Sequence, residues 1–241
     1  MGSKIYRRFL NSGPLIAAIT LAALYLNFSF ASSPSWASKP GEEKIALPKP
    51  MLSGKKSLEE TLATRRSVRS YSVQALSLEQ LSQLLWAAQG VTSEQGFRTA
   101  PSAGALYPLE VYAVVGRVEG LGVGVYKYLP SEHRLQKVQS GDQREALAKA
   151  ALSQSPVRDA AVDLVITAVY ERTMRKYGER GRRYVHIEVG HVGQNICLQA
   201  TAFGLGACTV GAFSDEQVKK TLALPTEEEP LYILSVGHRP D

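Results

Sequence analysis

The chain has 241 residues, of which 44% are hydrophobic and 21% charged, so one domain with a packed core is feasible. Its net charge is +6, but the first 37 residues hold three basic residues and no acidic one, which leaves 25 basic against 22 acidic residues beyond them. That mild excess excludes the strongly basic surface of a nucleic-acid-binding protein. Two cysteines without a CxxC motif argue against a disulfide framework or a structural zinc site.

The first 37 residues have the pattern of an export signal. Lys4, Arg7 and Arg8 form a positively charged start, an apolar run follows over residues 15–30, and residues 35–37 (Ser-Trp-Ala) match a small-x-small cleavage site. A retained membrane anchor is the alternative, because the apolar run approaches spanning length. The adjacent arginines also partly match a twin-arginine signal. We therefore expect an exported protein, periplasmic or associated with the cell envelope.

Residues 38–56 are rich in proline, glycine and charge, and we expect a linker or a strap along the domain of residues 57–241. The predicted elements of that domain, in chain order, are helices over 57–64 and 77–90, a strand over 109–115, a hairpin with strands over 123–129 and 133–138, a helix over 142–152, a strand over 162–170, a long helix over 184–203, an extended segment over 207–212, a helix over 214–222 and a strand over 231–236. Helices and strands mix without strict βαβ alternation, which favours an α+β fold.

A dense basic cluster follows the first predicted helix. Arg65, Arg66, Ser67 and Arg69 offer planar guanidinium donors and a hydroxyl, which suit an anion such as a phosphate. The alternative is a solvated basic turn that satisfies the last carbonyls of the helix. The residues alone favour neither.

Small and rigid residues precede the strand over 109–115. Residues 100–105 read APSAGA, where a surface turn would tolerate Asp, Asn or Lys. Such a loop suits a place where a flat or bulky group lies against the backbone. A tight loop packed against its own protein is the alternative.

Two further motifs contain residues that could bind a metal or transfer a proton. In HIEVGH the histidines His186 and His191 lie about 140° apart around a helix, so a metal site is not expected; Glu188 and His191 share a face and suggest a buried pair. Lys176 and Tyr177 lie in the most charged segment, ERTMRKYGERGRRY. From its composition alone, we expect this segment to be an exposed loop or helix.

Four motifs in order resemble the nitroreductase family: RRSVRSY, APSAGALYP, HIEVGHVGQNICLQATAFGLGACTVGAF and SVGHRP. The APSAG…YP form, KYG and E-x-G-H-x-x-Q-N are most similar to its SagB/ThcOx branch, which includes flavin-dependent oxidases of azoline rings in modified peptides. The resemblance covers about residues 57–240. It implies an α+β fold with a mixed or antiparallel sheet flanked by helices, a homodimer, and FMN bound noncovalently at the dimer interface.

The resemblance also implies roles for single residues. Arg65 and Ser67 would hold the FMN phosphate and ribityl chain, with Arg66 and Arg69 beside them. The C-terminal basic pair, His238 and Arg239, would close on the same phosphate.

The flavin ring itself would meet three other segments. Ser102, Ala103 and Gly104 match the loop that lies against the flavin, contributed by the partner subunit in many members, although Ala105 replaces a common asparagine. The backbone of Gly211 and Ala212 would face flavin N5. Lys176 and Tyr177 resemble an acid/base pair of the azoline oxidases.

We therefore expect an exported FMN-dependent oxidoreductase that works by ping-pong transfer of electrons or a hydride, on an unidentified small or peptide substrate. Azoline oxidases act in the cytoplasm with a cyclodehydratase, so the export signal argues against a peptide-ring substrate. The alternative is a non-catalytic flavin-binding or scaffold module of the cell envelope on the same fold. Membrane contact is expected only through an uncleaved N-terminus.

Overall fold

One seven-stranded sheet runs through the domain, and the computed structural model describes residues 43–240 of the chain. The strand order is β1-β4-β3-β2-β5-β7-β6, and every neighbouring pair is antiparallel. The strands are β1 Lys44–Ala46, β2 Leu109–Val115, β3 Gly124–Leu129, β4 Arg134–Ser140, β5 Val162–Ala168, β6 Leu205–Val210 and β7 Glu229–His238.

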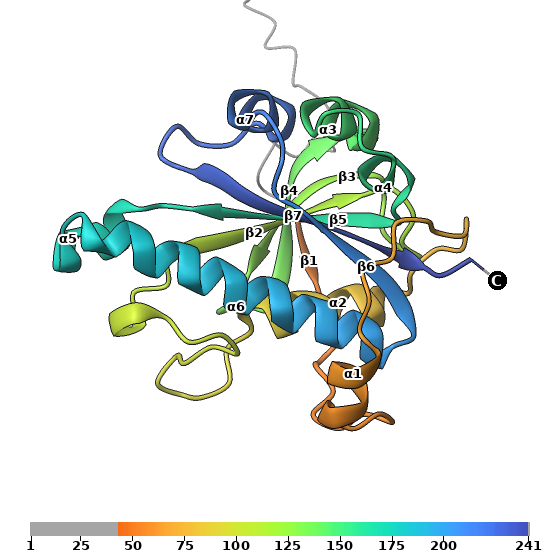
Figure 1. Ribbon diagram of the computed structural model, residues 1–241, viewed down its shortest axis with the longest axis horizontal. Helices are drawn as coiled ribbons and strands as arrows, with labels where there is room; N and C mark the ends of the chain where they lie inside the picture. The colour runs from red at the N-terminus through yellow and green to blue at the C-terminus, as the bar shows by residue number, and fades with distance from the viewer. Residues whose placement is uncertain (1–42, 241) are drawn as a thin grey trace, which may run out of the picture. The chain divides into compact units, whose positions relative to one another are not determined.

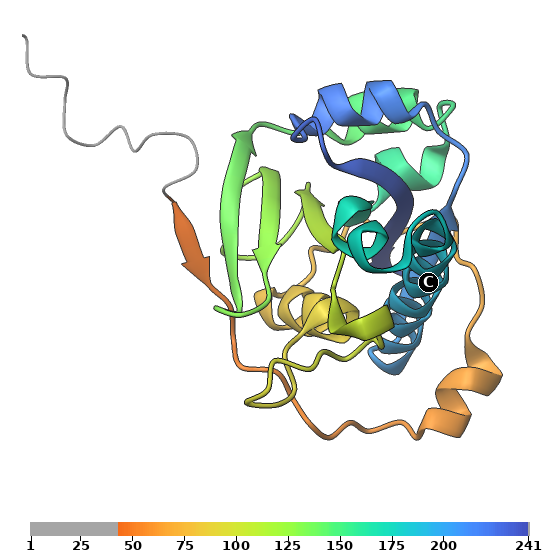
Figure 2. The ribbon, with the colours of Figure 1, turned by 90° about the vertical axis from the view of Figure 1, so that its left-hand side faces the viewer.

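Helices cover both faces of this sheet (Figures 1 and 2). On one face lie α1 (Leu58–Thr64), α2 (Leu78–Gln89) and the long α6 (Arg180–Ala202), and on the other lie α3 (Arg144–Ala150), α4 (Ser155–Asp159) and α7 (Asp215–Leu222). The short α5 (Glu171–Tyr177) packs against the start of α6. A buried hydrophobic cluster fills each of the two layers. The α+β fold with an antiparallel sheet is therefore confirmed.

The central strands are apolar because both of their faces are covered. All seven residues of β5 are buried, and in β2 only Glu110 is partly exposed. Asp163 is the acidic exception within β5; the Ser235 hydroxyl donates to it, and burial raises the pKa of this carboxyl well above its usual value.

Helix α6 lies along the sheet with one face buried and the other exposed. Its buried apolar residues recur at helical spacing: Val185, Val189, Val192, Ile196 and Ala200. The exposed stripe is made of Arg183, Ile187, Gly190, His191 and Gln194. The helix begins at Arg180, four residues earlier than the apolar pattern predicts, because its polar first turn lies beside α5.

Several boundaries differ from the sequence prediction. Part of the expected linker forms β1, which pairs with β4 at the edge of the sheet. Strand β6 begins at Leu205 rather than at residue 207, whereas the segment expected as an exposed loop or helix does form a helix, α5. Gly206 is thus part of a strand, and a larger residue would not fit there, because a Cβ would lie 2.6 Å from Val68 Cγ1. The expected export signal, residues 1–37, lies outside the described residues.

Within residues 43–240, none of the helices combines the length and the apolar character that a membrane-spanning segment needs.

Tyr71 fastens the basic segment of residues 65–72 onto the sheet, and this contact gives a stability prediction. Its hydroxyl lies 2.8 Å from the Val68 carbonyl and 2.9 Å from the Ser235 carbonyl. A Cβ at Gly237 would lie 2.9 Å from Tyr71 Cγ, so Gly237→Ala should overpack this contact and lower the free energy of unfolding by about 1–3 kcal/mol. Urea unfolding measures the change.

Gly54→Ala is the matched control, because no atom lies within 4 Å of a Cβ at that position. It should change the free energy of unfolding by less than about 0.5 kcal/mol. An unfolding midpoint of Gly237→Ala equal to that of the control would contradict the close packing of Tyr71.

Candidate functional site

The basic segment after α1 extends the sheet beyond its last strand. The Val68 N–H donates to the Ala207 carbonyl at 2.9 Å, and Ser67 forms a parallel bridge with Ala207 of β6. Arg65 ends α1, and its N–H donates to the Thr61 carbonyl. Ser67 and Val68 are therefore held against β6 by backbone pairing, and the arginines Arg65, Arg66 and Arg69 flank them.

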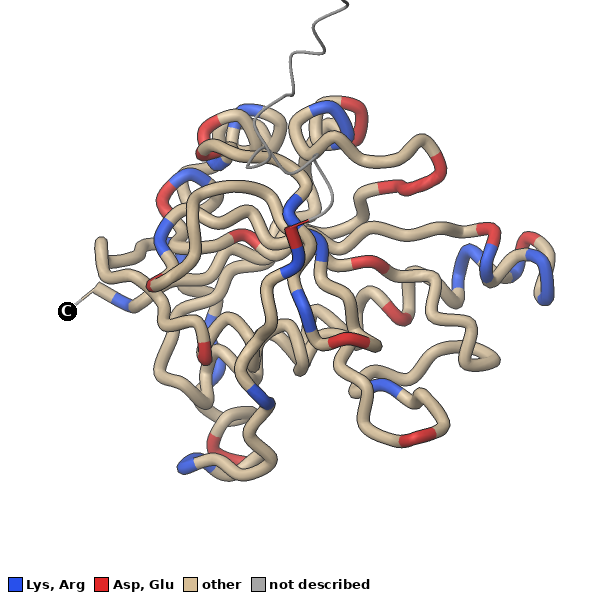
Figure 3. The backbone as a smooth tube through the Cα atoms, turned by 180° about the vertical axis from the view of Figure 1, so that it is seen from behind, with Lys and Arg blue, Asp and Glu red and all other residues tan. Residues whose placement is uncertain are grey.

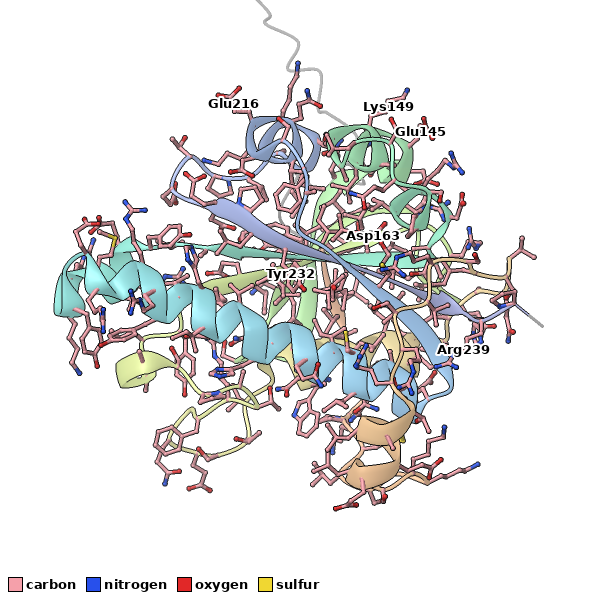
Figure 4. All side chains as sticks on the ribbon, viewed as in Figure 1. Glu145, Lys149, Asp163, Glu216, Tyr232 and Arg239 are labelled. Atoms are coloured by element: carbon pink, nitrogen blue, oxygen red, sulfur yellow. The ribbon has the colours of Figure 1, made fainter. Side chains whose placement is uncertain are left out.

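The C-terminal basic pair reaches the same strand from its other side. His238 is paired with Leu205 in the β6–β7 ladder, and the Ser72 N–H donates to the His238 carbonyl at 2.9 Å. Arg239 Nε donates to the Leu205 carbonyl at 3.2 Å, and Figure 4 shows Arg239 beside β6. The two distant basic segments of the sequence thus meet at β6.

The positive charges of this region have no carboxylate partner among the described residues. No ion pair there involves Arg65, Arg66, Arg69 or Arg239. Arg66 Nη1 does donate to the Ala63 and Arg65 carbonyls, so the helix-capping alternative holds for that one side chain. The remaining unpaired guanidinium groups suit a dianion such as a phosphate.

The small-residue loop is a strained turn. Ala103–Ala105 form a single 3-10 turn, and Gly104, Ala105 and Tyr107 have φ angles of 65°, 53° and 46°. Left-handed backbone is costly for residues other than glycine, so this conformation must be imposed by its surroundings. One such contact is the Tyr107 N–H, which donates to Ser102 Oγ at 2.9 Å.

Lys176 and Tyr177 lie directly over this loop. A Cβ at Gly104 would be 2.9 Å from Tyr177 Oη and 3.1 Å from Lys176 Nζ. The Tyr177 ring packs edge-on against Tyr184 at 5.1 Å between centroids, which fixes its orientation. Gly104 leaves room for the ends of these two side chains of the same chain, and its φ of 65° by itself favours glycine. The spacing of the motifs does not reveal this contact.

A buried carboxyl lies beneath the loop. Glu188 on α6 is 2% exposed, and burial raises its pKa to about 7, while the hydroxyl of Ser102, the amide of Gln89 and the charge of Arg98 oppose this shift. Its Oε1 has no hydrogen-bond partner within residues 43–240. The expected buried pair of Glu188 and His191 is wrong, because the side chain of His191 is exposed to solvent while that of Glu188 is buried.

Gly211 and Ala212 lie just beyond the end of β6, both exposed, rather than inside the predicted extended segment. Neither backbone N–H donates a hydrogen bond to another residue of the described chain. The ring of Tyr232 lies between α6 and this segment, 3.0 Å from a Cβ at Gly193 and 3.9 Å from one at Gly211 (Figure 4). Two unpaired N–H groups are therefore presented at the surface.

The two parts of the site lie beside different halves of α6 (Figure 1). Glu188 marks the loop end, and Cys197, whose thiol pKa burial raises and Arg65 lowers, marks the basic end. Nine residues separate them, which is about 14 Å along a helix axis. No group of side chains within residues 43–240 could hold a metal ion.

Glu188 gives a pH prediction. With a folded-state pKa of about 7 against an ordinary value of 4.5, the folded chain keeps a proton that the unfolded chain loses between these pH values. The contribution of Glu188 to the free energy of unfolding should therefore fall as pH rises through this window. Glu188→Gln cannot ionise, so its stability relative to wild type should increase from about pH 5 to about pH 8.

Urea unfolding across that pH range tests this, with Glu216→Gln on the exposed surface of α7 as the control for removing a carboxylate. A difference between Glu188→Gln and wild type that stays constant with pH would contradict the buried, proton-binding carboxyl.

Comparison with known proteins accounts for this arrangement. The model of the nitroreductase family matches residues 62–238. A protein of Methanocaldococcus jannaschii named as a nitroreductase is 50% identical over 182 residues, which are 76% of this chain and 91% of that protein. A crystal structure of a protein named as a nitroreductase from Ralstonia eutropha is similar with a TM-score of 0.72 and 30% identity, over 85% of this chain and 93% of that one.

A second solved structure agrees with the resemblance to the SagB/ThcOx branch. A chain of the Escherichia coli microcin synthetase McbBCD complex is similar with a TM-score of 0.65 and 28% identity, over 83% of this chain and 80% of that one. The fold, the order of the motifs and the relatives agree: this chain belongs to the nitroreductase family.

Proposed function

We propose that this protein is an FMN-dependent oxidoreductase, active as a homodimer, that passes electrons or a hydride from one substrate to a second in a ping-pong cycle. The observation that carries the proposal is the set of arginines beside β6 that have no acidic partner among residues 43–240. It combines with a strained loop under a Lys-Tyr pair at the other end of α6.

The residues present fit FMN at its phosphate end. Arg65, Ser67, Arg69 and Arg239 surround the start of β6, and the arginines have no acidic partner among residues 43–240. A phosphate dianion would relieve the repulsion between these charges and accept bidentate hydrogen bonds from them. Arg66 and His238 lie beside these residues and add positive or polar character.

The residues present also fit a planar ring. Gly211 and Ala212 present two unpaired N–H groups, which could donate to a negatively charged ring edge. Ser102, Ala103 and Gly104 carry no bulky side chain of their own, and Lys176 and Tyr177 approach the loop at Gly104. When bound, FMN would supply the two-electron chemistry that no amino-acid side chain provides.

Lys176 and Tyr177 are placed to handle a proton. Their Nζ and Oη atoms both approach Gly104, and Lys176 Nζ lies 5.4 Å from the centroid of the Tyr177 ring. Each can hold or release one proton, so the pair could act as general acid and base on a substrate that rests over the loop.

A homodimer would bring the two halves of the site together. In a twofold pairing, antiparallel α6 helices would place the loop end of one chain beside the basic end of its partner. The exposed stripe of α6 suits such a pairing, because Gly190 has no bulk and Ile187 is an apolar side chain 50% exposed. Met51, Leu52 and Leu58 are also exposed and line a groove of about 920 Å³.

The sequence pattern of residues 1–37 leads us to propose that the enzyme is exported. NAD(P)H is scarce outside the cytoplasm, so another electron donor would be needed. We do not propose that this chain acts on the substrate of the microcin synthetase. Its electron donor and acceptor are proposed only as small molecules or peptides.

Arg65→Ala should weaken FMN binding by about tenfold or more, because one charge-assisted contact to the phosphate is lost. The flavin content of the purified protein, from its visible spectrum and the flavin released on heating, measures this. Arg158→Ala is the control, since Arg158 is exposed on α4 and pairs with Asp159. Full flavin content in Arg65→Ala would contradict the phosphate site, and a wild-type protein that binds no added FMN would favour the scaffold module.

Ile187→Glu should separate the proposed dimer into monomers, because it introduces a charge into the centre of the α6 stripe. Analytical ultracentrifugation measures the mass, and bound flavin should fall in parallel. Leu152→Glu is the matched control, since Leu152 is 69% exposed after α3, on the other face of the sheet. A dimer that persists in Ile187→Glu would exclude this face as the interface.

A further inference from the structure

We propose that the hollow beside the Lys176–Tyr177 pair binds an anionic group of the substrate, a carboxylate or a phosphate. This inference rests on the proposed function and specifies the substrate class for the same site. It concerns the wall formed by α5, of which the motifs of the family resemblance include only Lys176 and Tyr177.

The hollow is open and has a volume of about 600 Å³. It is lined by Leu106 of the loop and by Arg172, Arg175 and Lys176 of α5. Lys176 therefore borders the hollow and also approaches Gly104. A group bound among these cations would lie next to the loop and the Lys-Tyr pair.

One arginine of the wall is fixed, and the other two cations are free to bind. Arg172 Nη2 donates to Glu110 Oε1 at 2.5 Å, and its Nη1 donates to the Tyr107 carbonyl at 3.1 Å. Among residues 43–240, neither Arg175 nor Lys176 has a hydrogen bond or an ion pair; Lys176 lies near the Tyr177 ring and approaches Gly104. Both side chains are exposed at the mouth of the hollow.

The surrounding charges do not neutralise these cations. Residues 170–184 contain six basic and two acidic residues, an excess of four positive charges, and Figure 3 shows them gathered at α5 and the start of α6. Glu179 is paired with Arg182, and Glu110 is shared between Arg172 and Lys127. Glu171, at the start of α5, is the remaining acidic residue of the corner.

A solvated basic face would be expected to spread its charge over the surface. Here Arg175 and Lys176 border one shallow, open hollow together with Leu106, so an anion and an adjoining apolar portion of one molecule could be held together. Guanidinium and ammonium groups at the mouth would raise the local concentration of anions and orient them. The structure thus favours a small substrate with an anionic end and an apolar or aromatic body.

Matched probes test this: 4-nitrobenzoate and 4-nitrophenyl phosphate are anionic, and 4-nitrobenzamide is a neutral analogue of similar shape. Equilibrium dialysis with the purified protein measures binding of each probe, with and without added salt. The variant is Arg175→Gln, an exposed position, and the control is Arg180→Gln, an exposed arginine of the same corner that does not line the hollow.

We expect wild type to bind at least one anionic probe more tightly than the amide. Arg175→Gln should weaken that binding by about tenfold, and Arg180→Gln by much less. The anion that binds more tightly identifies the group. Equal binding of all three probes, or equal losses in Arg175→Gln and Arg180→Gln, would overturn the proposal.

Dialysis does not depend on flavin chemistry, so the two proposals fail separately. A protein that binds the anions but carries no flavin would contradict the oxidoreductase and retain the anion site. A flavoprotein that reduces 4-nitrobenzamide and 4-nitrobenzoate with equal kcat/KM, and binds both equally, would retain the oxidoreductase and exclude the anion site.

Discussion

The packing of α6 against the sheet is the constraint on which the rest of this domain depends. Its apolar residues, from Val185 to Ala200, are buried against the strands, so the helix cannot shift along the sheet without exposing them. At one end it supports the loop through Glu188, and at the other it leads through Gly204 into β6. The distance between the two halves of the site is therefore set by a helix length.

Electrostatics divides this site into two parts with different requirements. At β6, two basic segments meet, and their arginines have no acidic partner among residues 43–240, so an anion could compensate for their charge. Beneath the loop the opposite problem arises, since Glu188 is a carboxyl removed from water with one oxygen unpaired. Burial favours its neutral form, and Arg98 and Ser102 limit the shift. The two ends thus carry opposite kinds of electrostatic cost.

Close backbone contacts hold both parts in place. Gly206 and Gly237 allow Val68 and Tyr71 to pack closely against β6 and β7, which fixes the basic segment. Gly104 likewise allows Lys176 and Tyr177 to approach the strained loop, where two neighbouring non-glycine residues have positive φ angles. Backbone strain and close-packed glycines therefore occur where candidate functional side chains come close to the backbone.

Local patterns in the sequence determined most of the elements: the serine caps at Ser57 and Ser77, the apolar strand over 109–115 and the periodic stripe of α6 needed no tertiary information. The order of motifs also identified the family and the basic residues that meet at β6. Tertiary structure alone decided what those patterns could not encode. Strand β1 forms by pairing with the open edge of β4. Glu188 is buried beneath the loop instead of pairing with His191, and Lys176 lies over Gly104. These contacts join residues far apart in the chain, so local propensity carries no record of them.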